Sequence, residues 1–90
     1  MLDLLIRNGL VIDGSGSPGF YAAVLVENER VSIQRGDVSH LEAAQLIDAT
    51  GHLVCPGFID LHSHAGLTIL GAPHHDPKVR QGVTTELVGI

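Results

Sequence analysis

The sequence predicts a β-rich segment over residues 1–55, followed over residues 56–90 by a strand–helix–strand unit that forms part of a larger sheet or barrel. In the first segment, short apolar runs rich in β-branched residues alternate with clusters of turn-forming residues, as is typical of strands. In the last third, helix start and stop signals lie between two apolar runs. Two parallel strands leave their outer edges unpaired, so we expect this fold to be incomplete within the chain.

Two β-hairpins are predicted over residues 1–34. In the first, residues 2–6 and 10–12 flank Asn8-Gly9, a dipeptide that favours a type I′ turn. In the second, two apolar runs flank the polar residues 27–29. The loop between the hairpins, residues 13–19, contains the Gly-x-Gly-x-x-Gly pattern of dinucleotide sites. A strand is expected after this loop where such a site needs a helix, so no nucleotide site is predicted.

The middle of the chain predicts one short helix and two short strands. Ser39 and Glu42 have the spacing of a capping box, which predicts one or two helical turns over residues 41–45. Brief strands are expected over residues 46–48 and 52–55, around a Thr-Gly turn. The single cysteine, Cys55, is expected to be a small buried hydrophobe.

A strand–helix–strand unit is predicted for the last third. Residues 58–62 form a compact strand candidate, and the next strand is expected over residues 83–88. Between them, Asp76 has the character of an N-cap, Pro77 of a first helical residue, and Gly82 of a helix stop.

Composition excludes several classes of protein. The chain has 90 residues, of which 44% are hydrophobic and 17% charged, so it can form one modest core. Five Lys and Arg residues against ten Asp and Glu residues predict no nucleic-acid partner. No apolar run approaches the roughly 20 residues of a membrane span, so no membrane partner is expected. A lone cysteine and the lack of signal-peptide features favour a cytoplasmic location.

The strongest chemical signal is His62-Ser63-His64. On a strand, residues i and i+2 point to the same face, so both imidazoles can reach one cation, at about 2.0–2.1 Å for zinc. Asp60 shares that face and is a candidate for orienting a ligand histidine or for lying near the metal. The pattern is short, however, and two histidines can also fall near a strand end by chance.

Two histidines do not complete a catalytic zinc site, which uses three protein ligands and a water. Within the chain, the candidates for further metal or substrate contacts are His74, His75 and Asp76. The same three residues are also typical of an exposed helix N-terminus. His40 and His52 lie in turn-like contexts and are expected to be solvated.

The sequence of residues 54–64, Val-Cys-Pro-Gly-Phe-Ile-Asp-Leu-His-Ser-His, resembles the first barrel strand of the amidohydrolase superfamily, which reads Pro-Gly-Phe-Ile-Asp-x-His-x-His. Four further segments resemble the D-aminoacylase (N-acyl-D-amino-acid deacylase) branch: residues 3–9, 12–20, 47–51 and 78–85. Together these segments span nearly the whole chain, which would then be the N-terminal part of such an enzyme.

The resemblance implies that residues 1–55 form part of a small β-sandwich. Residues 56–90 would form the first strand, helix and second strand of a (β/α)8 barrel of the TIM type, a fold of about 250 residues. His62 and His64 match the family's metal-ligand pair, with one or two divalent ions, Zn2+ above all. The bridging ligand (Cys, Glu or modified Lys), the later histidines and the Asp that activates water would lie beyond Ile90, so no catalytic residue is expected within the segment.

The implied function is metal-dependent hydrolysis of linear amide C–N bonds in small molecules, above all N-acyl-D-amino acids, with the 90-residue chain alone inactive. Ala65-Gly66, where the family often has an Asp, and the pair His74-His75 depart from the family pattern in loops that set substrate choice. The alternatives are a cyclic amidohydrolase of the dihydroorotase or hydantoinase kind, a non-catalytic β-module, and a cupin-type barrel. The cupin pattern requires a Glu at the positions of Thr68 or Ile69, which this chain lacks. The sequence leaves the exact substrate, the metal and the oligomeric state open.

Overall fold

A computed structural model describes residues 1–66 and 68–88 of the chain. The chain divides into two compact units, Met1–Pro56 and Gly57–Ile90. The described residues are rich in strands and contain two helices of four residues each. Neither helix has the length or the run of apolar residues that crossing a lipid bilayer requires.

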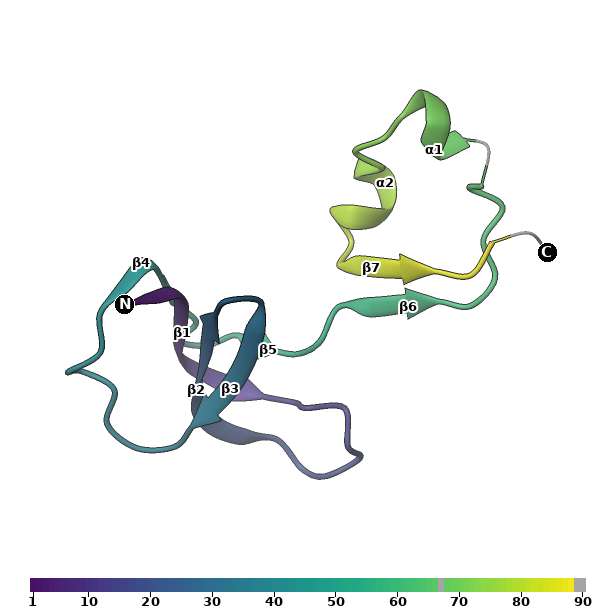
Figure 1. Cartoon of the computed structure of the whole chain (residues 1–90). Coiled ribbons are helices and arrows are strands. Elements are labelled where there is room, and N and C mark those ends of the chain that lie inside the picture. The colour runs from purple at the N-terminus through teal and green to yellow at the C-terminus, as the bar shows by residue number, and fades with distance from the viewer. Residues whose placement is uncertain (67, 89–90) are drawn as a thin grey trace. The chain divides into compact units, whose positions relative to one another are not determined.

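The N-terminal unit is one mixed sheet (Figure 1). Its strands are β1 (Leu2–Val11), β2 (Phe20–Glu27), β3 (Arg30–Gln34), β4 (Ala43–Asp48) and β5 (Leu53–Val54). The order is β3-β2-β1-β4, and β5 also pairs with β1. Strand β1 runs antiparallel to β2 and parallel to β4 and β5, so it is the central strand of the unit.

The hairpin predicted at Asn8-Gly9 is wrong, because β1 is a single strand with a β-bulge at this point. The pairing with β2 passes from Ile6↔Val24 to Gly9↔Ala22, which leaves one extra residue on β1. Asn8 has the positive φ of 67° that is expected in a turn, but this residue lies within the bulge and the strand continues past it. β1 continues because β2, β4 and β5 supply partners along its length, and the Asn8 side chain donates a hydrogen bond to Asp48 of β4 (Nδ2 to Oδ1, 3.1 Å).

The second hairpin is confirmed as β2 and β3, joined through Asn28 and Glu29. Both linking residues have positive φ, 52° and 64°, as a type I′ turn requires. The loop that precedes β2 leads into a strand, which agrees with the rejection of a nucleotide site.

The helical turns predicted over residues 41–45 are wrong, because residues 43–48 form β4. A helix this short has little stability of its own, and pairing along β1 outweighs it. The predicted cap is also absent: the Ser39 backbone N–H donates to the Asp37 side chain (2.9 Å). The brief strands on either side of Thr50-Gly51 are present, but Cys55 is exposed rather than buried.

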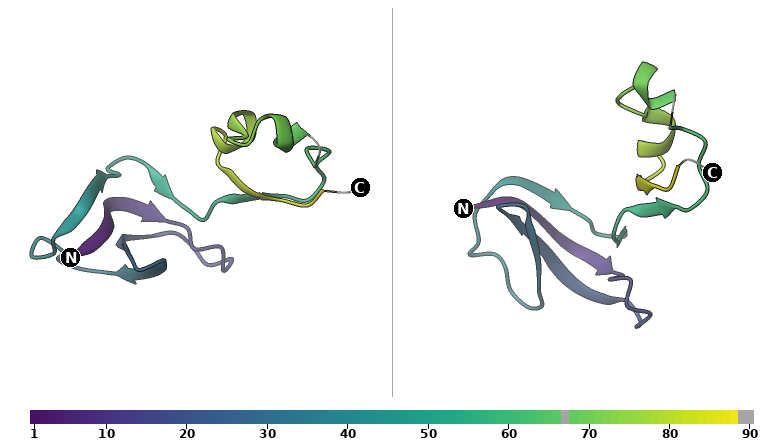
Figure 2. Two further views of the ribbon diagram at one scale, coloured as in Figure 1. Left: turned by 45° about the horizontal axis from the view of Figure 1, so that its top comes forward. Right: turned by 45° about the vertical axis from the view of Figure 1, so that its right-hand side comes forward.

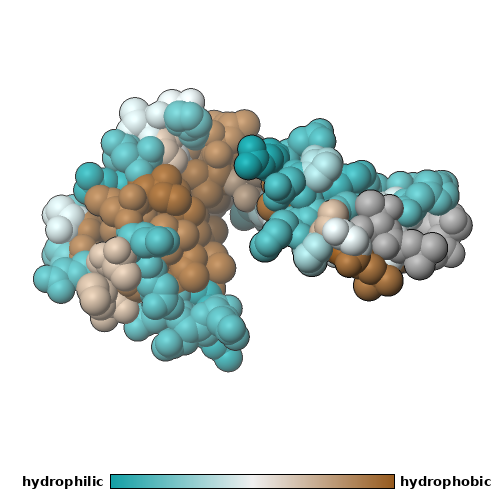
Figure 3. Space-filling view, turned by 90° about the horizontal axis from the view of Figure 1, so that it is seen from above, coloured by the Kyte–Doolittle hydropathy of each residue, from teal (hydrophilic) through white to brown (hydrophobic). Residues whose placement is uncertain are grey.

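The core of the N-terminal unit is small. Leu5, Val11, Ala23 and Ala49 are its buried hydrophobic residues, each at most 6% exposed. Beside them the sheet has an apolar hollow of about 470 Å³, whose lining includes Ile6, Val24, Ile33 and Val54. Figure 3 shows apolar side chains gathered on this unit. Several large hydrophobic side chains of the unit are exposed to solvent; Leu53, for example, is 65% exposed.

The C-terminal unit is built on two parallel strands, β6 (Phe58–Asp60) and β7 (Val83–Glu86). Two single-turn helices, α1 (Thr68–Gly71) and α2 (Asp76–Val79), connect the strands and lie on one side of them (Figures 1 and 2). The strand–helix–strand order predicted from the sequence is confirmed, although α1 was not foreseen.

Two details of this unit differ from the prediction. β6 ends at Asp60 instead of reaching His62. The N-cap of α2 is His75 in the left-handed conformation (φ 50°), and Asp76 is the first helical residue, with no side-chain cap hydrogen bond. Gly82, at φ 88°, follows α2 and allows the chain to turn into β7, as expected of a helix stop.

Candidate metal centre

His62 and His64 lie just beyond the carboxyl end of β6, and both are exposed. The sequence predicted a strand that reaches His62, but His62 lies in a bend after β6 and His64 follows in irregular backbone. Their ring centroids are 5.1 Å apart, and the ring planes are inclined by 66°. The two imidazoles are therefore neighbours although their backbone is not a regular strand.

The ring spacing fits a shared metal ion. Two imidazoles bound to one tetrahedral zinc through Zn–N bonds of about 2.0–2.1 Å hold their ring centres about 5 Å apart. Imidazole nitrogen is also a donor that suits zinc. The assignment of His62 and His64 as metal ligands stays a prediction that this geometry supports.

Among the described residues, no further metal ligands are gathered around the pair. Within residues 1–66 and 68–88, no group of three or more His, Cys, Asp or Glu side chains is arranged to hold a metal ion. His74 is exposed and lines a hollow of about 560 Å³, and His75 is engaged with Glu86. A complete catalytic zinc site would thus need ligands other than those predicted at residues 74–76.

Asp60 holds the backbone before the histidines rather than an imidazole ring. Its Oδ1 accepts a hydrogen bond from the backbone N–H of His62 (3.0 Å), and its Oδ2 accepts one from Nζ of Lys78 on α2 (2.5 Å). Lys78, followed by the His62 amide, holds the pKa of Asp60 below its usual value. Asp60 in turn raises the pKa of Lys78. The carboxylate therefore stays ionised and links α2 to the start of the histidine segment.

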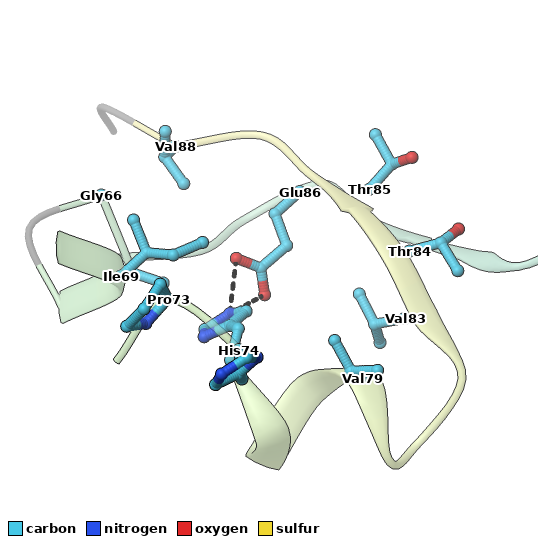
Figure 4. A pocket seen from close by; sticks show the side chains of 12 residues that line it. Gly66, Ile69, Pro73, His74, Val79, Val83, Thr84, Thr85, Glu86 and Val88 are labelled. Atoms are coloured by element: carbon cyan, nitrogen blue, oxygen red, sulfur yellow. Dashed lines mark hydrogen bonds and ion pairs between the residues drawn. The ribbon is translucent and has the colours of Figure 1, made fainter. Parts of the chain in front are cut away.

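A second carboxylate, Glu86 at the end of β7, is the centre of a partly buried polar cluster. Both of its oxygens lie 3.0 Å from Nε2 of His75, and Oε2 accepts a hydrogen bond from the hydroxyl of Ser63 (3.2 Å). Lys78 Nζ lies 3.7 Å from Oε1. Figure 4 shows Glu86 pointing from β7 into the 560 Å³ hollow, whose wall includes Val79 of α2.

Sequence reasoning left the roles of Ser63 and Lys78 unassigned and the orientation of Glu86 undecided. One signal could have found part of the cluster: Asp60 and Glu86 are acidic residues within two predicted strands, 58–62 and 83–88, which a helical connection makes parallel neighbours. The structure pairs these two residues in register. Like charges placed opposite each other are unfavourable, so a cation such as Lys78 is needed between them.

Individual proteins of known sequence and structure are similar to this chain over nearly its whole length. No profile of a known protein family matches the chain. N-acyl-D-glutamate deacylase of Alcaligenes xylosoxydans xylosoxydans is 43% identical over 88 residues, which make up 98% of this chain and 18% of that protein. The crystal structure of N-acyl-D-glutamate deacylase from Bordetella bronchiseptica, complexed with zinc and a phosphonate inhibitor, matches with a TM-score of 0.90 at 39% identity, over 98% of this chain and 18% of that one.

A D-aminoacylase mutant in complex with copper chloride gives a TM-score of 0.89 at 40% identity, over 99% of this chain and 19% of that one. A crystal structure of D-aminoacylase is described as defining a subset of amidohydrolases. The chain belongs to the amidohydrolase superfamily. Within it, the chain belongs with the D-aminoacylases and N-acyl-D-amino-acid deacylases, and it spans about a fifth of their length.

Cyclic amidohydrolases match less of the chain. Dihydroorotase of Aquifex aeolicus is 44% identical over 64 residues, which make up 71% of this chain and 15% of that protein. The deacylases align with nearly all of the chain, so the linear-amide branch is the better match.

Proposed function

We propose that this chain is the N-terminal part of a metal-dependent amidohydrolase that hydrolyses N-acyl-D-amino acids. The observation that carries the proposal is the alignment with deacylases over 98% of the chain, which includes a His-x-His segment at the carboxyl end of a parallel strand. In TIM-type barrels, active sites lie at the carboxyl ends of the strands. His62 and His64 occupy that position on β6.

In this proposal, β6, the helical connection and β7 are the first units of a (β/α)8 barrel. The sheet of the N-terminal unit is part of a β-sandwich, and strands from elsewhere in the full-length protein would cover apolar side chains that are now exposed, such as Leu53. Burial of such side chains provides a driving force for that association. We also propose a cytoplasmic location, in line with the single cysteine.

His62 and His64 would hold a divalent metal, zinc in the first instance. When bound, such an ion supplies Lewis-acid polarisation and lowers the pKa of bound water towards about 7. The described residues contribute binding and orientation: two imidazole donors, and a backbone that Asp60 and Ser63 tie to neighbouring elements. The proton-transferring carboxylate and the remaining ligands would come from other parts of the protein.

The proposal is tested with the full-length polypeptide that contains this chain. We expect it to release amino acid from N-acetyl-D-glutamate or another N-acyl-D-amino acid faster than from the L-enantiomer. His62→Ala should lower zinc content and turnover together, while His40→Ala, an exposed histidine of the N-terminal unit, should change neither. A His62→Ala variant that keeps both its zinc and its turnover would contradict the proposal.

Two further assays separate the alternatives. Hydrolysis of dihydroorotate or a hydantoin, with no action on N-acyl-D-amino acids, would assign the protein to the cyclic amidohydrolases. The isolated 90-residue chain should show no hydrolysis, because the described residues lack a third metal ligand beside the histidine pair. Detectable turnover by that chain would refute this part of the account.

A further inference from the structure

Ser63, between the two histidines, is the most buried described residue of the C-terminal unit. It is 4% exposed, and it is the one polar residue among the buried residues of the described chain. A buried hydroxyl needs hydrogen-bond partners, because leaving it unpaired costs about 1–3 kcal/mol. Ser63 Oγ has two: it donates to Glu86 Oε2 and accepts from the backbone N–H of Ala65, each at 3.2 Å.

These contacts fix the histidine segment at both ends. On the side of His62, the backbone N–H is held by Asp60. On the side of His64, Ser63 joins the turn at Ala65 to Glu86 of β7. The backbone of Ser63 also donates to the carbonyl of Leu87 (3.1 Å), which extends the pairing of the two strands up to the histidines.

Glu86 is itself held by two further groups. His75 Nε2 lies 3.0 Å from both of its oxygens, and Lys78 Nζ lies 3.7 Å from one of them. The side chains of Glu86 and His75 are only 11% and 14% exposed. His75 adopts a left-handed backbone conformation, with φ 50°. That conformation is costly for a non-glycine residue, and it is retained where the surroundings enforce it.

We propose that Glu86 is a positioning residue for the metal centre: through Ser63 it holds the segment of residues 62–65 so that the imidazoles of His62 and His64 stay at metal-binding spacing. His75 and Lys78 fix the Glu86 carboxylate. This inference rests on the proposed function, because it takes the two histidines to be metal ligands. It also gives His75 a role other than the metal or substrate contact suggested by the sequence.

The test compares four variants of the full-length protein: Ser63→Ala, Glu86→Ala, Glu86→Gln and the control Glu42→Gln, which changes an exposed carboxylate of the N-terminal unit. Zinc affinity is measured by competition with a chelator. Loss of groups that orient metal ligands typically weakens metal affinity about 10–100-fold, and we expect a loss of that size for Ser63→Ala and Glu86→Ala. Glu86→Gln should recover part of the affinity, because its amide oxygen can still accept the Ser63 hydroxyl.

Two readouts separate positioning from general stability. The absorption spectrum of the cobalt-substituted protein reports ligand geometry, and it should change in Ser63→Ala and Glu86→Ala but not in Glu42→Gln. In the metal-free protein, hydrogen exchange at the amides of residues 62–65 should accelerate in the same two variants. If Glu86→Ala does not fold, Ser63→Ala decides the question, because it removes one hydroxyl and no charge.

Zinc affinity, cobalt spectrum and hydrogen exchange that match those of the unsubstituted protein in Ser63→Ala and in folded Glu86→Ala would overturn the positioning role. The His62→Ala variant keeps this outcome distinct from failure of the proposed function. If His62→Ala loses zinc while Ser63→Ala does not, only the positioning role is refuted. If His62→Ala also retains zinc, the metal-centre assignment itself is refuted.

Discussion

The close approach of β6 and β7 at Gly57 predicts a strong and specific effect of a single methyl group. An alanine Cβ at this position would lie 2.7 Å from Thr84 Cβ and closer still to the Oγ1 and Cγ2 atoms of Thr84. Ordinary contacts of this kind begin at 3.4 Å, so three atoms overlap at once. Because overpacking typically costs about 1–3 kcal/mol, we expect Gly57→Ala to lower the free energy of unfolding of the full-length protein by that amount.

The assay is a double-mutant cycle measured by urea unfolding. Thr84→Gly removes the overlapping side chain, so Gly57→Ala in that background should be nearly neutral, which gives a coupling of about 1–3 kcal/mol. Gly71→Ala is the matched control, because nothing lies within 4 Å of a methyl group there. Its effect should stay within about 0.5 kcal/mol. An equal cost of Gly57→Ala in both backgrounds would refute the close parallel packing of the two strands.

Three further predictions concern other contacts of the fold. Hydrogen bonds from Thr50 and Asn8 lower the pKa of Asp48 from 3.8 to about 2. The ionised carboxylate therefore stabilises the folded unit above pH 3.8, and this stabilisation is lost as the pH falls through about 2. In urea unfolding across this range, the free energy of unfolding of Asp48→Asn should depend less on pH than that of the unsubstituted protein. Gly9→Ala places a methyl group against Val54 and should lower the free energy of unfolding by about 1–3 kcal/mol. Adding Val54→Ala should restore most of that stability, as measured by thermal denaturation. If Val54→Ala restores none of it, the packing of β5 on β1 is contradicted. Lys78→Met should raise the pKa of Asp60, which carboxyl NMR titration would detect, and an unchanged value would contradict the ion pair.

Local signals predicted the fold where local and long-range preferences agree. The β2–β3 hairpin and the strand–helix–strand unit follow from turn residues and apolar runs that are satisfied by neighbours in the sequence. The signals failed in β1 and β4. Asn8-Gly9 has the chemistry of a turn, and Ser39 has the spacing of a cap. In both places pairing with distant strands outweighed the local preference.

The sequence likewise predicted only one part of the candidate site. The pair His62 and His64 is visible in the sequence, because both residues lie in one short segment. The cluster around Glu86 joins residues from β7, α2 and the bend after β6. The parallel register of β6 and β7 brings these residues together, and no local pattern encodes that register. The exposure of Cys55 likewise depends on which parts of the sheet remain uncovered.

The most direct test of the central claim is anomalous diffraction at the zinc edge from crystals of the full-length protein. The account predicts an anomalous peak at about 2.0–2.1 Å from a ring nitrogen of both His62 and His64. A fully occupied zinc site elsewhere in the protein, with neither histidine within bonding distance, would contradict it.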